Sequence, residues 1–226
     1  MHIPDGFIDG GTSLAAGVLA AGGTAAVLKV AGRELDERRV PLAGVTAAYV
    51  FAAQMLNFPV ASGTSGHLLG GALAAVLVGP WVASLCLTVV LVVQALVFAD
   101  GGLSALGLNA INLSFIGVFG GWAAFRALRA VLPARPGSVV VASGVAAGLS
   151  VVLASLGFVA QYAIGGAGGA SVSTVAGAMV GVHVLIGIGE GVITALTVGA
   201  VLASRPDLVH GAADLPPAPA VQGAAA

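Results

Sequence analysis

Long apolar runs divide this chain into helical segments. Runs of about 20 apolar residues alternate with short polar or glycine- and proline-containing stretches, and a helix needs about 20 residues to cross roughly 30 Å of hydrocarbon. A transmembrane β-barrel would instead alternate apolar and polar residues over segments of roughly 10. The pattern predicts an all-α, polytopic membrane protein. We expect a bundle of seven transmembrane helices, near residues 10–31, 42–57, 67–79, 81–99, 113–132, 138–164 and 176–203.

The stretch 68–98 can be read as one kinked helix or as two helices joined at Gly79-Pro80. A single helix at 1.5 Å per residue would extend about 46 Å, too long for one span without severe tilt. With two helices, all eight basic residues fall near one side of the membrane. The positive-inside rule then places the N-terminus outside and the C-terminus in the cytoplasm. These basic residues are Lys29, Arg33, Arg38, Arg39, Arg126, Arg129, Arg135 and Arg205.

Composition supports a lipid environment and excludes other classes. Charged residues make up 8% of the chain and mean hydropathy is +1.08, whereas soluble domains carry about 25% charged residues. The net charge of -1 gives no reason to expect nucleic acid as a partner. Cys86 is the single cysteine, so no internal disulfide is possible. We predict an integral membrane domain over 1–205 and a disordered, Pro- and Ala-rich cytoplasmic tail over 206–226.

Few polar side chains are available for chemistry, and an ionisable residue inside a span is costly enough to suggest a function. His67 follows the stretch NFPVASGTSG, and irregular backbone at membrane depth is tolerated only where protein or a cavity surrounds it. The short span after it suggests a loop that dips inward and delivers His67 to the interior. The alternative is a capping loop at the outer surface with a solvated histidine.

The terminal pair Met1-His2 can chelate a metal. In a chain that starts X-His, the α-amine, the amide nitrogen of residue 2 and the imidazole close two chelate rings on one ion. A fourth donor such as the His67 imidazole would complete a square-planar set of four nitrogens, which suits Ni(II), Cu(II) or low-spin Co(II). On its own, Met-His at a terminus is a weak signal.

Four motifs together carry a family resemblance. MHIPDGFI, SGTSGHLLGGALAAVLVGPW, QALVFADGGLSALGLNAINL and HVLIGIGEGVITAL resemble the substrate-capture component of cobalt and nickel energy-coupling-factor importers, the CbiM/NikM family. The resemblance implies a seven-helix bundle into which the N-terminal segment inserts from the outer face. It also implies that Co(II) or Ni(II), as transported substrate, is ligated by the Met1 amine, the His2 amide and imidazole, and the His67 imidazole.

The resemblance further implies a transporter component of the cell's cytoplasmic membrane and not an enzyme. Family members work with a transmembrane coupling protein and cytoplasmic ATPase subunits, and in many cases with a small accessory membrane subunit. The chain contains no G-x-x-x-x-G-K-[ST] loop, so we expect its partners to hydrolyse ATP.

His183 and Glu190 are seven residues apart and nearly on one face of the last predicted helix. They are candidates to orient a metal ligand or to hold the N-terminal loop through hydrogen bonds. Alternatively, they form a polar clasp between helices that never approaches the metal. Asp100 is better explained as a turn and capping residue than as a ligand. Asn109 and Asn112 are candidates to anchor the outer loop.

Two rival functions remain at this point. GTSG at 63–66 matches the G-x-S-G motif of rhomboid-like intramembrane serine proteases, with Ser65 as nucleophile and His183 as base. Against this reading, Gly187 follows His183 by four residues instead of three, and no Trp-Arg loop precedes the motif. A structural membrane subunit or passive channel explains the hydropathy but not the histidines that we expect inside the bundle.

Overall fold

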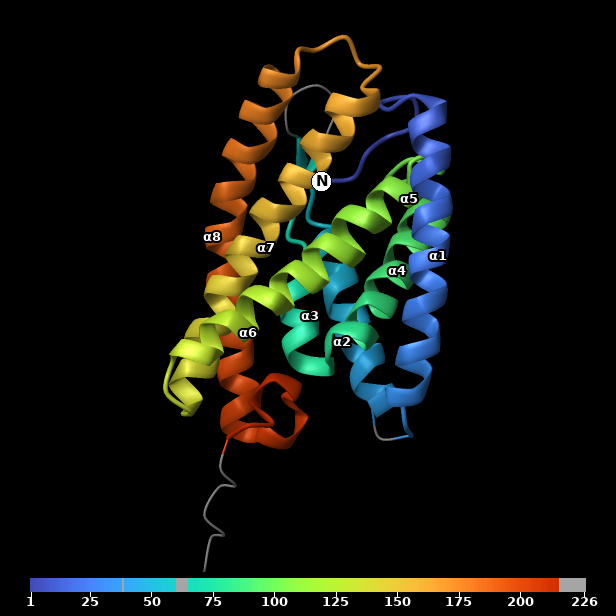
Figure 1. Cartoon of the computed structure of the whole chain (residues 1–226). Helices are drawn as coiled ribbons and strands as arrows, with labels where there is room; N and C mark the ends of the chain where they lie inside the picture. Colours follow the sequence, from blue (N-terminus) through green and yellow to red (C-terminus); the bar gives the residue numbers. More distant parts are fainter. Residues whose placement is uncertain (38, 60–64, 216–226) are drawn as a thin grey trace, which may run out of the picture.

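The structure, a computed structural model, describes residues 1–37, 39–59 and 65–215 and is a bundle of helices (Figure 1). In chain order the main helices are α1 (Gly10–Glu34), α2 (Arg39–Gln54), α3 (Gly71–Val78), α4 (Pro80–Val97), α5 (Leu106–Asn109), the π-helix η2 (Ala110–Gly120), α6 (Gly121–Val131), α7 (Pro136–Gly165) and α8 (Val172–Ser204). Two short strands, β1 (Phe58–Pro59) and β2 (Ser65–Gly66), pair antiparallel before α3.

Five described helical segments are long and apolar enough to cross a membrane: α1, α4, the continuous Leu106–Val131, α7 and α8. The chain is therefore a multi-pass helical membrane protein. The helix α2 is shorter, with 16 residues, and α3 has only 8. The chain between 68 and 98 forms two helices, because α3 ends at Val78 and α4 begins at Pro80, as the length argument predicted.

Three predicted helix starts differ from the structure by four residues or more, and one of them is the last span, which begins at Val172 instead of 176. The span expected from residue 67 begins only at Gly71, because Gly70 has a left-handed φ of 75° that does not continue a helix toward His67. The span expected from residue 113 begins already at Leu106. Its early turns contain Asn109, which looked like a loop residue but bonds to the N-terminal segment instead.

The short helix α3 forms the centre of the bundle. All its residues are buried, and it contacts α2, α4, η2, α6 and α7. On one side of the bundle, α7 and α8 approach each other backbone to backbone. A Cβ on Gly144 would lie 2.9 Å from the carbonyl oxygen of Gly191, and one on Gly187 would lie 2.9 Å from that of Gly148. Small residues therefore allow these two helices to pack closely.

The N-terminal segment runs into the bundle from one end, and Figure 1 shows the N-terminus among the helices. Met1 and Ile3 are fully buried and His2 is 4% exposed. The side chain of Asn109 makes two hydrogen bonds with the main chain of Ile3. The Ile3 N–H donates to Oδ1 of Asn109 at 2.8 Å, and Nδ2 of Asn109 donates to the Ile3 carbonyl at 3.2 Å. Further along, the backbone N–H of Ser104 donates to Asp5 at 2.8 Å. Asn109 therefore anchors the N-terminal segment instead of the outer loop, and Asn112, the other predicted anchor, donates to Gln161 of α7 at 2.8 Å.

The segment after α8 was predicted to be disordered from residue 206, but its described part, 206–215, packs against the opposite end of the bundle. It forms two 3-10 turns, η3 (Pro206–Leu208) and η4 (His210–Ala212), and buries Val209. Arg129 of α6 donates to Asp214 at 2.8 Å. Apolar residues and one ion pair therefore fix this stretch beneath α3, and only 216–226 lie outside the described residues.

Candidate metal site

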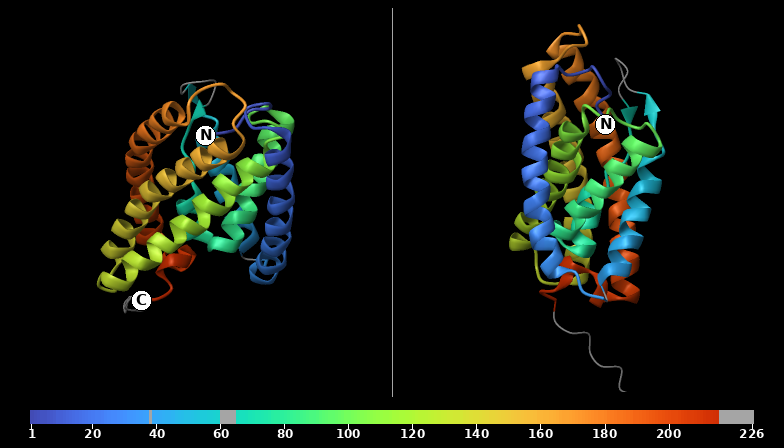
Figure 2. Two further views of the ribbon diagram at one scale, coloured as in Figure 1. Left: turned by 45° about the horizontal axis from the view of Figure 1, so that its top comes forward. Right: turned by 90° about the vertical axis from the view of Figure 1, so that its right-hand side faces the viewer.

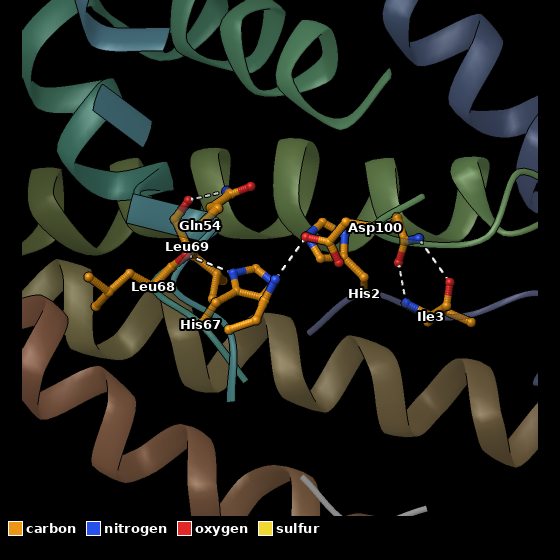
Figure 3. Close-up of polar contacts among 9 residues, drawn as sticks. His2, Ile3, Gln54, His67, Leu68, Leu69 and Asp100 are labelled. Carbon is orange, nitrogen blue, oxygen red and sulfur yellow. Dashed lines mark hydrogen bonds and ion pairs between the residues drawn. The ribbon is translucent and has the colours of Figure 1, made fainter. Parts of the chain in front are cut away.

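The buried end of the N-terminal segment places His2 against His67. The two imidazole rings stack with their centroids 4.5 Å apart and an interplanar angle of 22°. His67 is fully buried, so the alternative of a solvated histidine in a surface loop is wrong. Figure 3 shows the pair between the N-terminal segment and the chain that leads into α3. Two of the predicted ligand residues, 65 positions apart in the sequence, thus meet inside the bundle, and Met1 is buried beside them.

Hydrogen bonding fixes which nitrogen of the His67 ring carries a lone pair, and a nearby carboxylate favours one tautomer of His2. Nδ1 of His67 lies 2.8 Å from the carbonyl oxygen of Leu68, which can only accept, so Nδ1 carries the proton. Its Nε2 is buried and has no hydrogen-bond partner among the described residues. Nε2 of His2 lies 3.7 Å from Oδ2 of Asp100, which favours a proton there and leaves Nδ1 as the ring nitrogen that a terminal chelate uses.

The electrostatics keep these nitrogens unprotonated. Burial lowers the pKa of the Met1 amine well below its ordinary 8.0, although the Asp100 carboxylate opposes the shift. Burial, and then the charge of the amine, lower the pKa of His2 to about 3. Burial also holds the pKa of His67 well below 6.5, with smaller effects from the amine, His2 and His183. A neutral amine and neutral imidazoles are the forms that bind a metal.

The residues after His67 are held by side chains from other helices. Glu190 of α8 accepts hydrogen bonds from the backbone N–H groups of Leu69 and Gly70. Gln54 of α2 donates to the Leu69 carbonyl at 2.7 Å. Gln54 was not predicted from the sequence, where its only signal is one amide at the end of a mostly apolar helix.

His183 lies in the same helix as Glu190 and is fully buried. Its Nδ1 is 2.7 Å from the carbonyl oxygen of Met179, so its Nε2 carries the lone pair. That Nε2 has no hydrogen-bond partner in the described part of the chain. Asp100, expected to act in a turn, accepts from Nδ2 of Asn57 at 2.9 Å besides facing His2.

Within the described residues, no three side chains of His, Cys, Asp or Glu converge in a way that could hold a metal ion. The predicted donor set does not require such a cluster, because two of its four nitrogens belong to the main chain.

Comparison with known proteins decides the family. The family model described as cobalt uptake substrate-specific transmembrane region, CbiM, matches residues 2–208. The chain belongs to the CbiM family. The resemblance seen in the four sequence motifs is thereby confirmed, and the family is one of transport components and not of enzymes.

Individual relatives of this CbiM-family chain agree. A Haloquadratum walsbyi protein provisionally named a metal transport protein is 41% identical over 92% of this chain and 93% of its own length. The cobalt transport protein CbiM of Sorangium cellulosum is 37% identical over 78% of this chain and 79% of its own. A crystal structure of a truncated transition metal transporter superposes with a TM-score of 0.84 at 30% identity, covering 90% of this chain and 99% of that one.

The comparisons give no support to the protease reading. Residues 63 and 64 of the GTSG motif and the side chain of Ser65 lie outside the described residues. Membership of a transport family also speaks against a purely structural subunit.

Proposed function

We propose that this chain captures Co(II) or Ni(II) with high affinity at the outer face of the cytoplasmic membrane and supplies it to an ATP-driven energy-coupling-factor importer. One observation carries the proposal: a Met-His terminus is buried in the bundle with its imidazole stacked on that of a second buried histidine. Membership of the cobalt uptake family supports the choice of ion.

In this proposal the donors are the Met1 α-amine, the amide nitrogen and Nδ1 of His2, and Nε2 of His67. The first three close a five-membered and a six-membered ring, and the fourth completes a planar set. To bind one ion, the stacked imidazoles turn their lone-pair nitrogens toward it. Loss of the His2 amide proton gives the complex one negative charge to set against the two positive charges of the metal.

We further propose seven membrane spans, with α2 and α3 serving as the two short ones, the N-terminus outside and the C-terminus in the cytoplasm. The distribution of charge supports this orientation. Four arginines mark the ends of helices at the end of the bundle away from the N-terminus (Figures 1 and 2): Arg33 in the last turn of α1, Arg39 at the start of α2, Arg129 near the end of α6 and Arg205 directly after α8. Such a one-sided cationic end is typical of a cytoplasmic face.

The partners that we propose are a transmembrane coupling protein, cytoplasmic ATPase subunits and a small accessory membrane subunit. Capture is then the chemistry of this chain, while its partners drive inward release. An Archaeoglobus fulgidus relative, provisionally named a fused nickel transport protein, is 36% identical over 93% of this chain and 68% of its own length. That relative supports nickel as an alternative to cobalt.

An N-terminal extension tests the proposed chelate. Co(II) and Ni(II) are titrated calorimetrically into a C-terminally tagged protein, whose free Met1 amine is verified by intact mass, and into the same protein with one extra N-terminal residue. The extension converts the Met1 amine into an amide and displaces both chelate rings, so we expect tight binding to be lost. Equal affinity in the two proteins would refute the proposed donor set.

A further inference from the structure

The main chain of Leu69 is held on both sides by buried side chains from distant helices. Its N–H donates to one carboxylate oxygen of Glu190, and the Gly70 N–H donates to the other oxygen at 2.9 Å. Its carbonyl accepts from Nε2 of Gln54 at 2.7 Å. Because a carbonyl oxygen only accepts, the Gln54 amide must present its NH2 group. Figure 3 shows Gln54 and Leu69 next to His67.

Glu190 also caps α3. The N-cap residue of this helix is Gly70, which offers no side chain to accept hydrogen bonds from the first turn. The carboxylate of Glu190, contributed by α8, lies at this N-terminus, where the helix dipole favours negative charge. Both of its oxygens accept from backbone N–H groups. A carboxylate can accept at both atoms, whereas a neutral amide of the same shape can accept only at its one oxygen.

The hydrogen bonds that hold Leu69 also limit where His67 can lie. Leu69 is two residues further along, and two residues of extended chain span at most about 7 Å. The imidazole itself has one hydrogen bond among the described residues, to the carbonyl of its neighbour Leu68. The position of the ring relative to His2 therefore depends on where the backbone of residues 67–70 is held.

We propose that Gln54 and Glu190 are positioning residues, which clamp the Leu69 main chain and thereby set the His67 imidazole opposite His2. This inference rests on the proposed function. The clamp acts on the fourth metal donor alone, because the three donors of Met1 and His2 are held separately, through the contacts of Ile3 with Asn109.

A double-mutant cycle tests the clamp. We expect Glu190→Gln to weaken Co(II) binding about 10- to 100-fold, the usual effect of removing a group that orients a metal ligand. In the His67→Ala background, where Met1 and His2 still give weak binding, Glu190→Gln should have no further effect. The visible spectrum of Co(II) bound to Glu190→Gln should match that of Co(II) bound to His67→Ala. The control is Thr194→Val, one turn along α8, since the buried Thr194 hydroxyl has no hydrogen-bond partner among the described residues.

Three results would overturn the proposal that Glu190 and Gln54 position His67. Wild-type affinity in Glu190→Gln, or an equal loss in both backgrounds, would overturn the clamp. A lowered Tm with an unchanged spectrum would also overturn it, because that result describes a structural role only. If Glu190→Gln does not give a monodisperse protein, Gln54→Leu undergoes the same cycle, since it removes one bond to Leu69 and leaves the cap on α3. Failure of the wild-type protein to bind either ion would instead reject the proposed function.

Discussion

Gly70→Ala tests how tightly the segment between His67 and α3 is packed. Gly70 has a φ of 75°, and a Cβ built on it would lie 2.8 Å from Cγ2 of Val50, a nearly fully buried residue of α2. A left-handed conformation costs a residue other than glycine about 1–2 kcal/mol. Forcing one extra carbon against a packed side chain costs about 1–3 kcal/mol more. We therefore expect Gly70→Ala to lower the free energy of unfolding by about 2–5 kcal/mol.

Gly169→Ala separates the two contributions. Gly169, in the connection between α7 and α8, has a similar φ of 73°, but a Cβ added to it would meet no described atom within 4 Å. Its replacement should cost only the backbone term of about 1–2 kcal/mol. The difference between the two variants, about 2 kcal/mol, corresponds to roughly 6 °C in Tm for a chain of this size.

The assay is thermal unfolding of the purified protein in detergent, followed by Co(II) titration of each variant. Val50→Ala in the Gly70→Ala background should recover the part of the loss due to the clash but not the backbone part, so the two substitutions should couple. Only Gly70→Ala should also weaken Co(II) binding, because it displaces the segment that carries His67. Equal drops in Tm for Gly70→Ala and Gly169→Ala would show that Val50 yields freely and that the segment is loosely packed.

Three further predictions concern the proposed site. His67→Ala should abolish tight Co(II) or Ni(II) binding with the fold retained, whereas His183→Ala should weaken binding only partly; calorimetry giving the reverse order would reassign the fourth donor. Asp100→Asn should weaken Co(II) binding about 10-fold, because it removes the carboxylate that faces Nε2 of His2, and Asp207→Asn at the other end of the bundle should leave binding unchanged. Lowering the pH should loosen the seated N-terminal segment. An exposed imidazole gains a proton below its ordinary pKa of 6.5, whereas burial lowers the pKa of His2 to about 3, so the contribution of His2 to seating is complete above pH 6.5 and loses about 2 kcal/mol by pH 5. Burial also lowers the pKa of the Met1 amine well below its ordinary 8.0, so the contribution of the amine falls as well, starting near pH 8. Hydrogen exchange of residues 2–9 at pH 7.5 and pH 5 measures this change, and equal protection at both would contradict it.

The sequence predicted the elements whose signal is local. Long apolar runs located the helices, and the excess length of 68–98 located the break before Pro80. His2 and His67 were candidates because an ionisable imidazole is costly to bury inside a membrane protein and therefore suggests a function. That these two rings stack depends on tertiary packing, which no local pattern contains.

The remaining features depend on partners far away in the sequence. The early start of the helix at Leu106 was missed because Asn109 and the glycines near it are typical of a loop, and its hydrogen-bond partner Ile3 is 106 residues away. Gln54 was missed because a single amide at a helix end carries no pattern. The ordered stretch 206–215 was missed because it was grouped with the Pro- and Ala-rich residues 216–226, whereas burial of Val209 and the pair of Arg129 with Asp214 hold it against the bundle.

The hydrogen bond between Leu69 and Glu190 joins residues 121 positions apart, so it also sets an order of assembly. During synthesis, His67 and the short helix α3 enter the membrane well before α8 exists. Until α8 arrives, α3 lacks the carboxylate that caps it, and the segment carrying His67 lacks one of its two restraints. In a partly synthesised chain, His2 and His67 would therefore not yet be held in the arrangement that the proposed site requires. The proposed metal site would form only once the last helix is in place.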